Sequence, residues 1–173
     1  MTAWDELSYL KTMIDSYGPS GKVLLVGSRL YNGSYDRREW YKEVIGLDMQ
    51  DGPGVDVVHD LEKPYSGQFD HVDCCSVLEH VARPWLLAQN IQNVMVPGAS
   101  LVVSVPFSWR VHGYPSDYWR MTTEAVALLF DKVKWDRLVY VSNNLVVERP
   151  PGYRKKNKVY VERCEVVGFG WLR

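Results

Sequence analysis

The feature that most constrains the fold is the way two apolar runs end near the start of the chain. Val23–Val26 is followed directly by Gly27, and about twenty residues later Val44–Leu47 is followed by Asp48. In an open α/β sheet, such a glycine lets the backbone approach a ligand, and such an acid accepts hydrogen bonds from ribose hydroxyls. The segment therefore predicts a parallel sheet that holds a nucleoside at the carboxyl ends of its strands.

The bulk properties indicate one globular domain. The chain has 173 residues, 46% of them hydrophobic, and its net charge is −1 without a long basic run. We therefore expect a single domain over residues 1–173 and no nucleic-acid partner. No apolar stretch reaches the length of a membrane span, and the N-terminus is not a secretory signal, so we expect a cytoplasmic protein without a membrane partner. The sequence carries no signal for an oligomeric state.

The cysteines argue against a metal or redox centre. Cys74 and Cys75 are adjacent in an apolar run, Cys164 is distant, and no CxxC spacing occurs. We expect a buried, reduced pair at Cys74 and Cys75 and no metal site.

Strand and helix patterns alternate as far as residue 130, and two strands then follow close together. This order predicts an α/β fold, a doubly wound seven-stranded and mostly parallel sheet with an antiparallel edge strand. The Pro97-Gly98 pair predicts a turn, and Thr122 or Thr123 is expected to cap the last helix. The expected strands are Lys22–Val26, Glu43–Leu47, Val55–His59, Phe69–Val77, Ser100–Val105, Leu138–Ser142 and Val159–Val167, and the expected helices are Trp4–Tyr17, Tyr35–Tyr41 (short or irregular), Arg83–Val94 and Ala125–Phe130.

The turn after the first strand has an incomplete glycine pattern. Arg29 and Tyr31 stand where a full GxGxxG would place glycines, and the Asn32-Gly33-Ser34 turn can supply free N–H groups instead. Gly27 alone is equally consistent with an ordinary turn at the end of a strand.

Two further acids follow strands at the same expected edge. Asp48 can accept two hydrogen bonds from a ribose diol, and Asp60 can accept one from an adenine amine while the Leu61 N–H meets a ring nitrogen. The alternatives are a solvated turn acid or a helix cap for Asp48 and a simple cap for Asp60.

The segments after the fourth and fifth strands carry the remaining polar chemistry. Ser76–His80 lies at the mouth of the expected site, where Glu79 and His80 either transfer protons or orient the loop. The loop His112–Arg120 is rich in His, Asp, Tyr, Trp and Arg, which is typical of a functional loop on a rigid scaffold. Its alternative role is a packed loop whose polar groups satisfy each other. We expect His59 and His71 to be structural or solvated.

Together these residues resemble a known family. The order of elements, Gly27, Asp48, Asp60, the SVLEHV segment and MVPGASLVVSVP resemble the class I S-adenosylmethionine-dependent methyltransferases, and within them the methyltransferase type 11 group. The Asn-Gly-Ser turn, GPGVDVVHD and HGYPSDYWRMT resemble a bacterial methyltransferase-like subgroup. The resemblance covers residues 20–130, and it implies a Rossmann-like methyltransferase fold with S-adenosylmethionine as cofactor.

The resemblance also implies roles for individual residues. The cofactor would lie across the carboxyl ends of the first four strands, with its methionine portion at Gly27 and Ser28, its ribose at Asp48 and its adenine at Asp60 and Leu61. The full set of expected cofactor contacts is Gly27, Ser28, Gly33, Asp48, Met49, Asp60, Leu61 and Ser76.

The expected activity is methyl transfer to a small-molecule or sugar acceptor, at an oxygen atom. His112 is the first candidate for removing the acceptor's proton, and Asp117 is the second. Tyr114, Tyr118 and Trp119 would shape the acceptor pocket. Arg120 would pair either with a carboxylate or phosphate of the acceptor or internally with Asp117.

Two positions depart from the family's pattern. The acid that usually stands two residues before the first glycine is Leu25 here, and the second glycine is Arg29. They support an alternative, a non-catalytic accessory module with a degenerate cofactor loop. A nucleotide-binding oxidoreductase is disfavoured, because a full GxGxxG is absent and the expected edge hairpin is atypical of that class.

Overall fold

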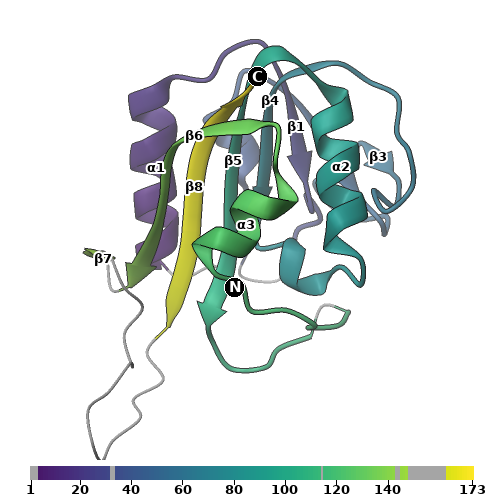
Figure 1. Cartoon of the computed structure of the whole chain (residues 1–173). Helices are drawn as coiled ribbons and strands as arrows, with labels where there is room; N and C mark the ends of the chain where they lie inside the picture. The colour runs from purple at the N-terminus through teal and green to yellow at the C-terminus, as the bar shows by residue number, and fades with distance from the viewer. Residues whose placement is uncertain (1–3, 32–33, 114, 143–144, 148–162) are drawn as a thin grey trace, which may run out of the picture.

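The computed structural model describes residues 4–31, 34–113, 115–142, 145–147 and 163–173. These residues form one eight-stranded sheet in the order β3-β2-β1-β4-β5-β8-β6-β7 (Figure 1). The strands are β1 (Lys22–Val26), β2 (Glu43–Asp48), β3 (Val57–Val58), β4 (Phe69–Cys75), β5 (Met95–Ser108), β6 (Val133–Ser142), β7 (Leu145–Val147) and β8 (Cys164–Leu172). The helices are α1 (Trp4–Tyr17), α2 (Pro84–Val94) and α3 (Thr123–Leu129), with short 3₁₀ turns η1 (Arg37–Trp40) and η2 (Leu78–His80).

The sheet is mostly parallel, as the alternation of elements predicts. Strands β3, β2, β1, β4 and β5 are parallel neighbours, whereas β8 is antiparallel to both β5 and β6. The three-residue β7, which the sequence pattern did not predict, forms an antiparallel edge beside β6. The closing pair of β6 and β8 is antiparallel and the sheet ends in an antiparallel strand, as expected; β8 lies inside the sheet, with its residues Cys164–Gly170 buried.

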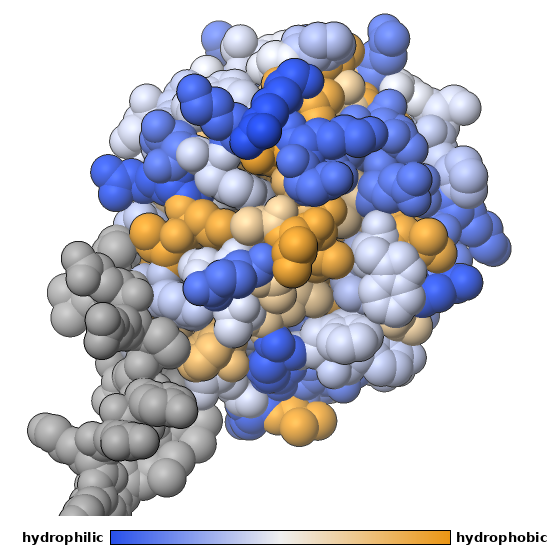
Figure 2. All heavy atoms as spheres, viewed as in Figure 1, coloured by the Kyte–Doolittle hydropathy of each residue, from blue (hydrophilic) through white to orange (hydrophobic). Residues whose placement is uncertain are grey.

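Helices cover both faces of the sheet (Figure 1). Leu87 and Ile91 of α2 and Val126 of α3 pack into the larger apolar cluster. Leu10 and Met13 of α1 pack into a second cluster on the opposite face. On the face in view in Figure 2, hydrophobic residues form small groups between hydrophilic ones, as expected of helices whose apolar sides face inward.

Several boundaries differ from the predicted ones. Strand β5 begins at Met95, because Pro97-Gly98 lies in a bulge of the strand and does not end it. Strand β6 begins at Val133, earlier than predicted, and β8 begins at Cys164, with the predicted start at residue 159 outside the described residues. The expected cap is confirmed, since the Thr122 hydroxyl accepts the Ala125 N–H at 3.1 Å. Cys74 and Cys75 are free and buried, as expected, and so is Cys164.

The topology leaves uncovered the edge of the sheet that is formed by the carboxyl ends of the parallel strands. The carboxyl ends of β1, β2, β4 and β5 point toward the same edge, at the bottom of Figure 1, where the loop after β5 crosses. Between β1 and β2 the described residues form only η1, so no full helix covers this part of the edge. Within the described part of the chain, no helix has the length and apolar character needed to cross a membrane.

Candidate active site

A cavity of about 710 Å³ lies at this open edge. Its walls come from the ends of β1, β2 and β4, the segment after β3, η2 and the loop after β5. The volume falls in the usual range for small-molecule and cofactor sites. Of the residues expected from the sequence, the structure places the following in the wall: Gly27, Ser28, Asp48, Met49, Asp60, Leu61, Ser76, His112 and Tyr118.

Gly27 has a structural reason to be glycine. Its φ is +67°, and a Cβ atom there would lie 2.5 Å from Cγ2 of Val77. Backbone conformation and packing thus account for the residue without a ligand. Ser28, the next residue, does support a ligand at this position, because its hydroxyl is buried and has no hydrogen-bond partner among the described residues.

Asp48 lies at the end of β2 with its carboxylate held by the backbone. One oxygen accepts the Gln50 N–H at 2.9 Å and the other accepts the Arg29 N–H at 3.3 Å. An ionised carboxylate has about four lone-pair positions, so each oxygen retains capacity for a ligand donor. Met49, in the same wall, is more than half exposed.

Asp60 and Leu61 follow β3 in a tight turn. One Asp60 oxygen accepts the Glu62 N–H at 3.0 Å, which is the local cap that served as its alternative interpretation. The Leu61 side chain is buried in the core, and its carbonyl accepts the side-chain amide of Asn90 at 2.8 Å. Asn90 thus connects α2 to the cavity wall, a role that the helical pattern of the sequence did not reveal.

Ser76 is the only non-glycine among the described residues with a positive φ, at 56°. Its N–H is bonded to the Ser104 carbonyl at 3.0 Å, so the neighbouring strand holds this conformation in place. Left-handed backbone in a non-glycine residue costs free energy and occurs preferentially at functional sites. The observation supports the expected position of Ser76 in a ligand site.

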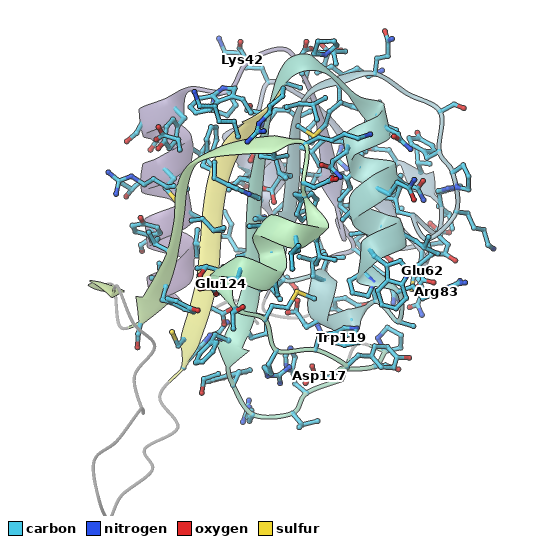
Figure 3. All side chains as sticks on the ribbon, in the orientation of Figure 1. Lys42, Glu62, Arg83, Asp117, Trp119 and Glu124 are labelled. Carbon is cyan, nitrogen blue, oxygen red and sulfur yellow. The ribbon has the colours of Figure 1, made fainter. Side chains whose placement is uncertain are left out.

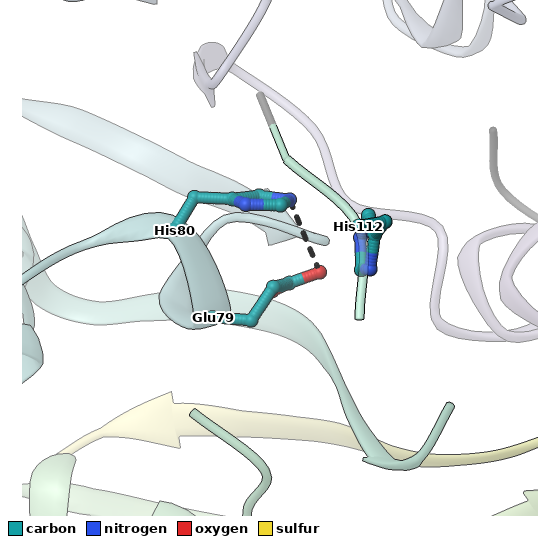
Figure 4. Close-up of side chains that lie close together, drawn as sticks. All are labelled: Glu79, His80 and His112. Atoms are coloured by element: carbon teal, nitrogen blue, oxygen red, sulfur yellow. Dashed lines mark ion pairs between the residues drawn. The ribbon is translucent and has the colours of Figure 1, made fainter. Parts of the chain in front are cut away.

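Glu79, His80 and His112 converge at one corner of the cavity (Figure 4). His80 Nε2 lies 3.7 Å from Glu79 Oε1, and the two imidazole rings meet edge to face at 4.9 Å. His80 Nδ1 lies 2.5 Å from the Ser116 carbonyl, so Nδ1 carries the hydrogen and donates it. Burial lowers the pKa of His80, which favours the neutral ring. His80 therefore anchors the loop after β5, as its alternative role predicted.

Asp117 holds His112 and is itself held by Arg120. Its Oδ2 accepts the His112 backbone N–H at 2.8 Å and lies 3.2 Å from His112 Nδ1. Arg120 binds both Asp117 oxygens, at 2.6 and 2.8 Å. The bonds from Arg120 hold the pKa of Asp117 well below its usual range despite burial, so it remains a carboxylate. Arg120 thus has the internal partner, and neither residue belongs to the cavity wall.

The aromatic residues of the loop divide between the wall and the outer surface. Tyr118 lines the cavity, and its N–H is bonded to the Glu79 carbonyl at 2.7 Å. Trp119 lies outside the wall, where its indole N–H is bonded to the Val81 carbonyl at 2.9 Å. Figure 3 shows Trp119 and Asp117 close together on this loop. Gly33 and Tyr114, expected in the cofactor and acceptor sites, and Asn32 lie outside the described residues.

One group of side chains has the donor atoms for a metal ion. In the described part of the chain, only Glu79, His80 and His112 form such a group, with their ligand atoms within 4.8 Å of one another. The sequence did not predict it, because these residues come from two distant segments.

The sequence also gave no signal for Arg37. This residue of η1 lines the cavity, is 9% exposed, and pairs with the fully buried Asp73 of β4 at 3.1 Å. Leu25, the β1 residue in register with Asp73, lines the cavity as well. Arg29 lies along the turn after β2, where its guanidinium donates to the Gln50 side chain at 2.6 Å.

No protein-family model and no curated protein matches the chain. Solved structures do match its fold. The N-methyltransferase NodS of Bradyrhizobium japonicum, bound to S-adenosyl-L-homocysteine, aligns with TM-score 0.64 at 12% identity over 98% of this chain and 88% of NodS. The magnesium protoporphyrin IX methyltransferase of Synechocystis, with bound S-adenosylmethionine, aligns with TM-score 0.63 at 12% identity over 100% and 86%.

A third match was solved with 1,6-didemethyltoxoflavin and S-adenosylhomocysteine bound. The 1,6-didemethyltoxoflavin N1-methyltransferase of Burkholderia thailandensis aligns with TM-score 0.64 at 13% identity over 94% of this chain and 76% of that one. Identities this low establish the architecture and not the acceptor. The chain therefore has the Rossmann-like fold of the class I S-adenosylmethionine-dependent methyltransferases.

Proposed function

We propose that the protein transfers a methyl group from S-adenosylmethionine to an oxygen atom of a small-molecule or sugar acceptor. The observation that carries this proposal is that one cavity joins two kinds of residue. The strand-end acids Asp48 and Asp60, suited to a nucleoside, share its wall with the corner formed by Glu79, His80 and His112. A donor and an acceptor can therefore meet inside a single site.

The residues present fit the donor in two respects. The buried Ser28 hydroxyl, which has no partner among the described residues, is a polar group for which a bound ligand would supply the hydrogen bond. Asp48 is fixed by two backbone N–H groups and still has acceptor capacity for ribose hydroxyls. Neither feature requires an acid at position 25 or a glycine at position 29. The departures from the family's pattern at Leu25 and Arg29 therefore leave this part of the site intact.

The bound cofactor would supply an electrophilic methyl group on a sulfonium, and the chain's contribution is to align the acceptor and to remove its proton. Asp117 keeps the His112 main chain in place, and the Arg110 carbonyl, 3.2 Å from Nδ1, favours the tautomer with hydrogen on Nδ1. The Nε2 atom of that tautomer is a base. We assign it the removal of the acceptor's proton, with Asp117 as a positioning residue.

The loop after β5 encloses this corner. Its bonds from Tyr118 to the Glu79 carbonyl and from His80 to Ser116 dock it on η2. Such docking keeps His112 at the acceptor side of the cavity and reduces the access of water.

The test is methyl transfer itself. The protein is incubated with S-adenosylmethionine labelled in its methyl group and with a panel of small hydroxylated compounds, sugars among them, alongside matched amines. We expect label in hydroxylated compounds, and the label must resist conditions that hydrolyse methyl esters. Labelling of amines alone would refute the assignment to oxygen. Donor binding without transfer to any compound would support the accessory-module alternative.

A further inference from the structure

Arg37 is a charged residue that the proposed chemistry does not use. It lies in η1, is 9% exposed, and contributes to the cavity wall. Its Nε donates to Asp73 Oδ2 at 3.1 Å, and its Nη2 donates to the Cys75 carbonyl at 3.4 Å. A guanidinium has five N–H donors in a planar fork, so these two bonds leave donors for a ligand in the cavity.

Asp73 shows that this pair is incomplete as it stands. The residue is fully buried, and its Oδ2 accepts from Arg37 and from the Tyr41 hydroxyl at 3.0 Å. Its Oδ1 is buried and accepts no hydrogen bond from any described residue. Burying an ion pair costs desolvation free energy that good geometry and full hydrogen bonding must offset. Asp73 itself is not part of the cavity wall, whereas Arg37 is, so the pair presents the spare guanidinium donors of Arg37 to an anionic group in the cavity.

The order of the strands indicates which part of the donor reaches this pair. Asp60 follows β3 and Asp48 follows β2, so a nucleoside on these acids extends next toward the ends of β1 and β4. Arg37 and the β4 residue Cys75 line the cavity there. Leu25, the β1 residue in register with Asp73, offers no charge, so Arg37 is the charged group that reaches the cavity here.

We propose that Arg37 binds the α-carboxylate at the amino-acid end of the methyl donor, with Asp73 behind it fixing the guanidinium. This inference rests on the proposed function. It also gives a physical reason why a leucine at position 25 is compatible with donor binding: η1 supplies a charged group for the amino-acid end, so β1 does not need to.

The test compares two ligands that differ only in the carboxylate, S-adenosylmethionine and its decarboxylated form. Their dissociation constants are measured by calorimetry for the wild type and for Arg37→Met. Arg37→Met removes the charge-assisted hydrogen bonds to the carboxylate. We therefore expect it to weaken S-adenosylmethionine binding by roughly ten- to a hundred-fold. Binding of the decarboxylated form should change by less than about threefold, which is within ordinary context effects.

Arg38→Met is the matched control. Arg38 is the adjacent residue of η1, but it binds the Gly54 carbonyl at 2.8 Å and Asp56 at 3.0 Å outside the cavity wall. We expect it to leave both affinities unchanged. If Arg37→Met fails to fold because Asp73 loses its partner, the double variant Arg37→Met/Asp73→Asn removes both charges and replaces it in the comparison.

The outcomes separate the two proposals. If Arg37→Met weakens both ligands equally, or neither, the assignment of Arg37 to the carboxylate is wrong and the proposed function stands. If the wild type binds neither ligand, the proposed function falls, and this inference falls with it.

Discussion

Asp117 Oδ2 accepts the His112 backbone N–H at 2.8 Å and lies 3.2 Å from His112 Nδ1, whose hydrogen-bond acceptor is the Arg110 carbonyl at 3.2 Å. Arg120 in turn holds both Asp117 oxygens. This arrangement fixes the ring without any contribution from a substrate. It is the geometry expected of a histidine whose Nε2 receives a proton.

We predict that His112→Gln lowers turnover on the identified acceptor and leaves donor binding intact. A positioned base contributes about 10²–10⁴-fold to the rate, so kcat at saturating acceptor should fall within that range. The dissociation constant of S-adenosylhomocysteine, measured by calorimetry, should be unchanged, because Asp48 and Asp60 lie elsewhere in the cavity wall. Unchanged kcat would remove His112 from the mechanism.

The Gly27 environment gives a stability prediction. Gly27→Ala combines an unfavourable φ of +67° with a 2.5 Å contact to Val77, and we expect a loss of roughly 1–3 kcal/mol in the free energy of unfolding by urea. Gly18→Ala is the control, since Gly18 has a φ of +56° and no atom within 4 Å of its Cβ position.

The difference between these two variants measures the Val77 contact. The double variant Gly27→Ala/Val77→Ala should therefore lose less stability than the sum of the losses of the two single variants. Equal losses for Gly27→Ala and Gly18→Ala would show that backbone conformation alone requires the glycine.

His71 predicts a pH dependence of stability. Burial lowers its pKa from 6.5 to about 4, against the opposing effects of Asp73 and Ser100. The folded state thus keeps the ring neutral while the unfolded state binds a proton below pH 6.5, so stability is complete above that pH and declines as the pH falls toward 4. Full protonation in the unfolded state would cost the protein about 3 kcal/mol in its free energy of unfolding, at 1.36 kcal/mol per pKa unit.

The measurement is urea unfolding at several pH values for wild type and His71→Gln. The wild type should lose more stability between pH 6.5 and 4 than the variant, because the variant lacks the titrating ring. Parallel pH profiles would contradict the neutral, buried state of His71.

The sequence predicted most of the sheet because its signals are local. Lys22–Val26 is an apolar run bounded by glycines, and helix Trp4–Tyr17 shows a 3.6-residue period, so both boundaries agree with the structure. The bulge at Pro97-Gly98 and the interior position of β8 depend on pairing between distant strands, which neither propensity nor periodicity encodes.

The same distinction applies to the site. Asp48 and Asp60 follow strand ends, where a rule of topology places ligands, and both line the cavity. Arg37 follows no motif, and its importance comes from Asp73 on a strand that folds against it. The proximity of Glu79 and His80 to His112 likewise results from docking of the loop after β5 on η2.

Asp48 offers a prediction about the cofactor with a close control. Asp48→Asn keeps the shape of the side chain and removes its charge, which should weaken S-adenosylhomocysteine binding by roughly tenfold or more. Asp51→Asn changes a nearby exposed acid outside the cavity wall and should have no effect. Equal effects of the two variants would show that Asp48 has no specific contact with the ligand.

The central claim is that the cavity at the carboxyl edge of the sheet holds the methyl donor, and calorimetric titration of the wild-type protein with S-adenosylmethionine tests it most directly. The account predicts saturable binding of one equivalent per chain, with a dissociation constant between about 1 μM and 1 mM, the usual range for enzyme substrates. The absence of saturable binding of both S-adenosylmethionine and S-adenosylhomocysteine at millimolar concentration would contradict it.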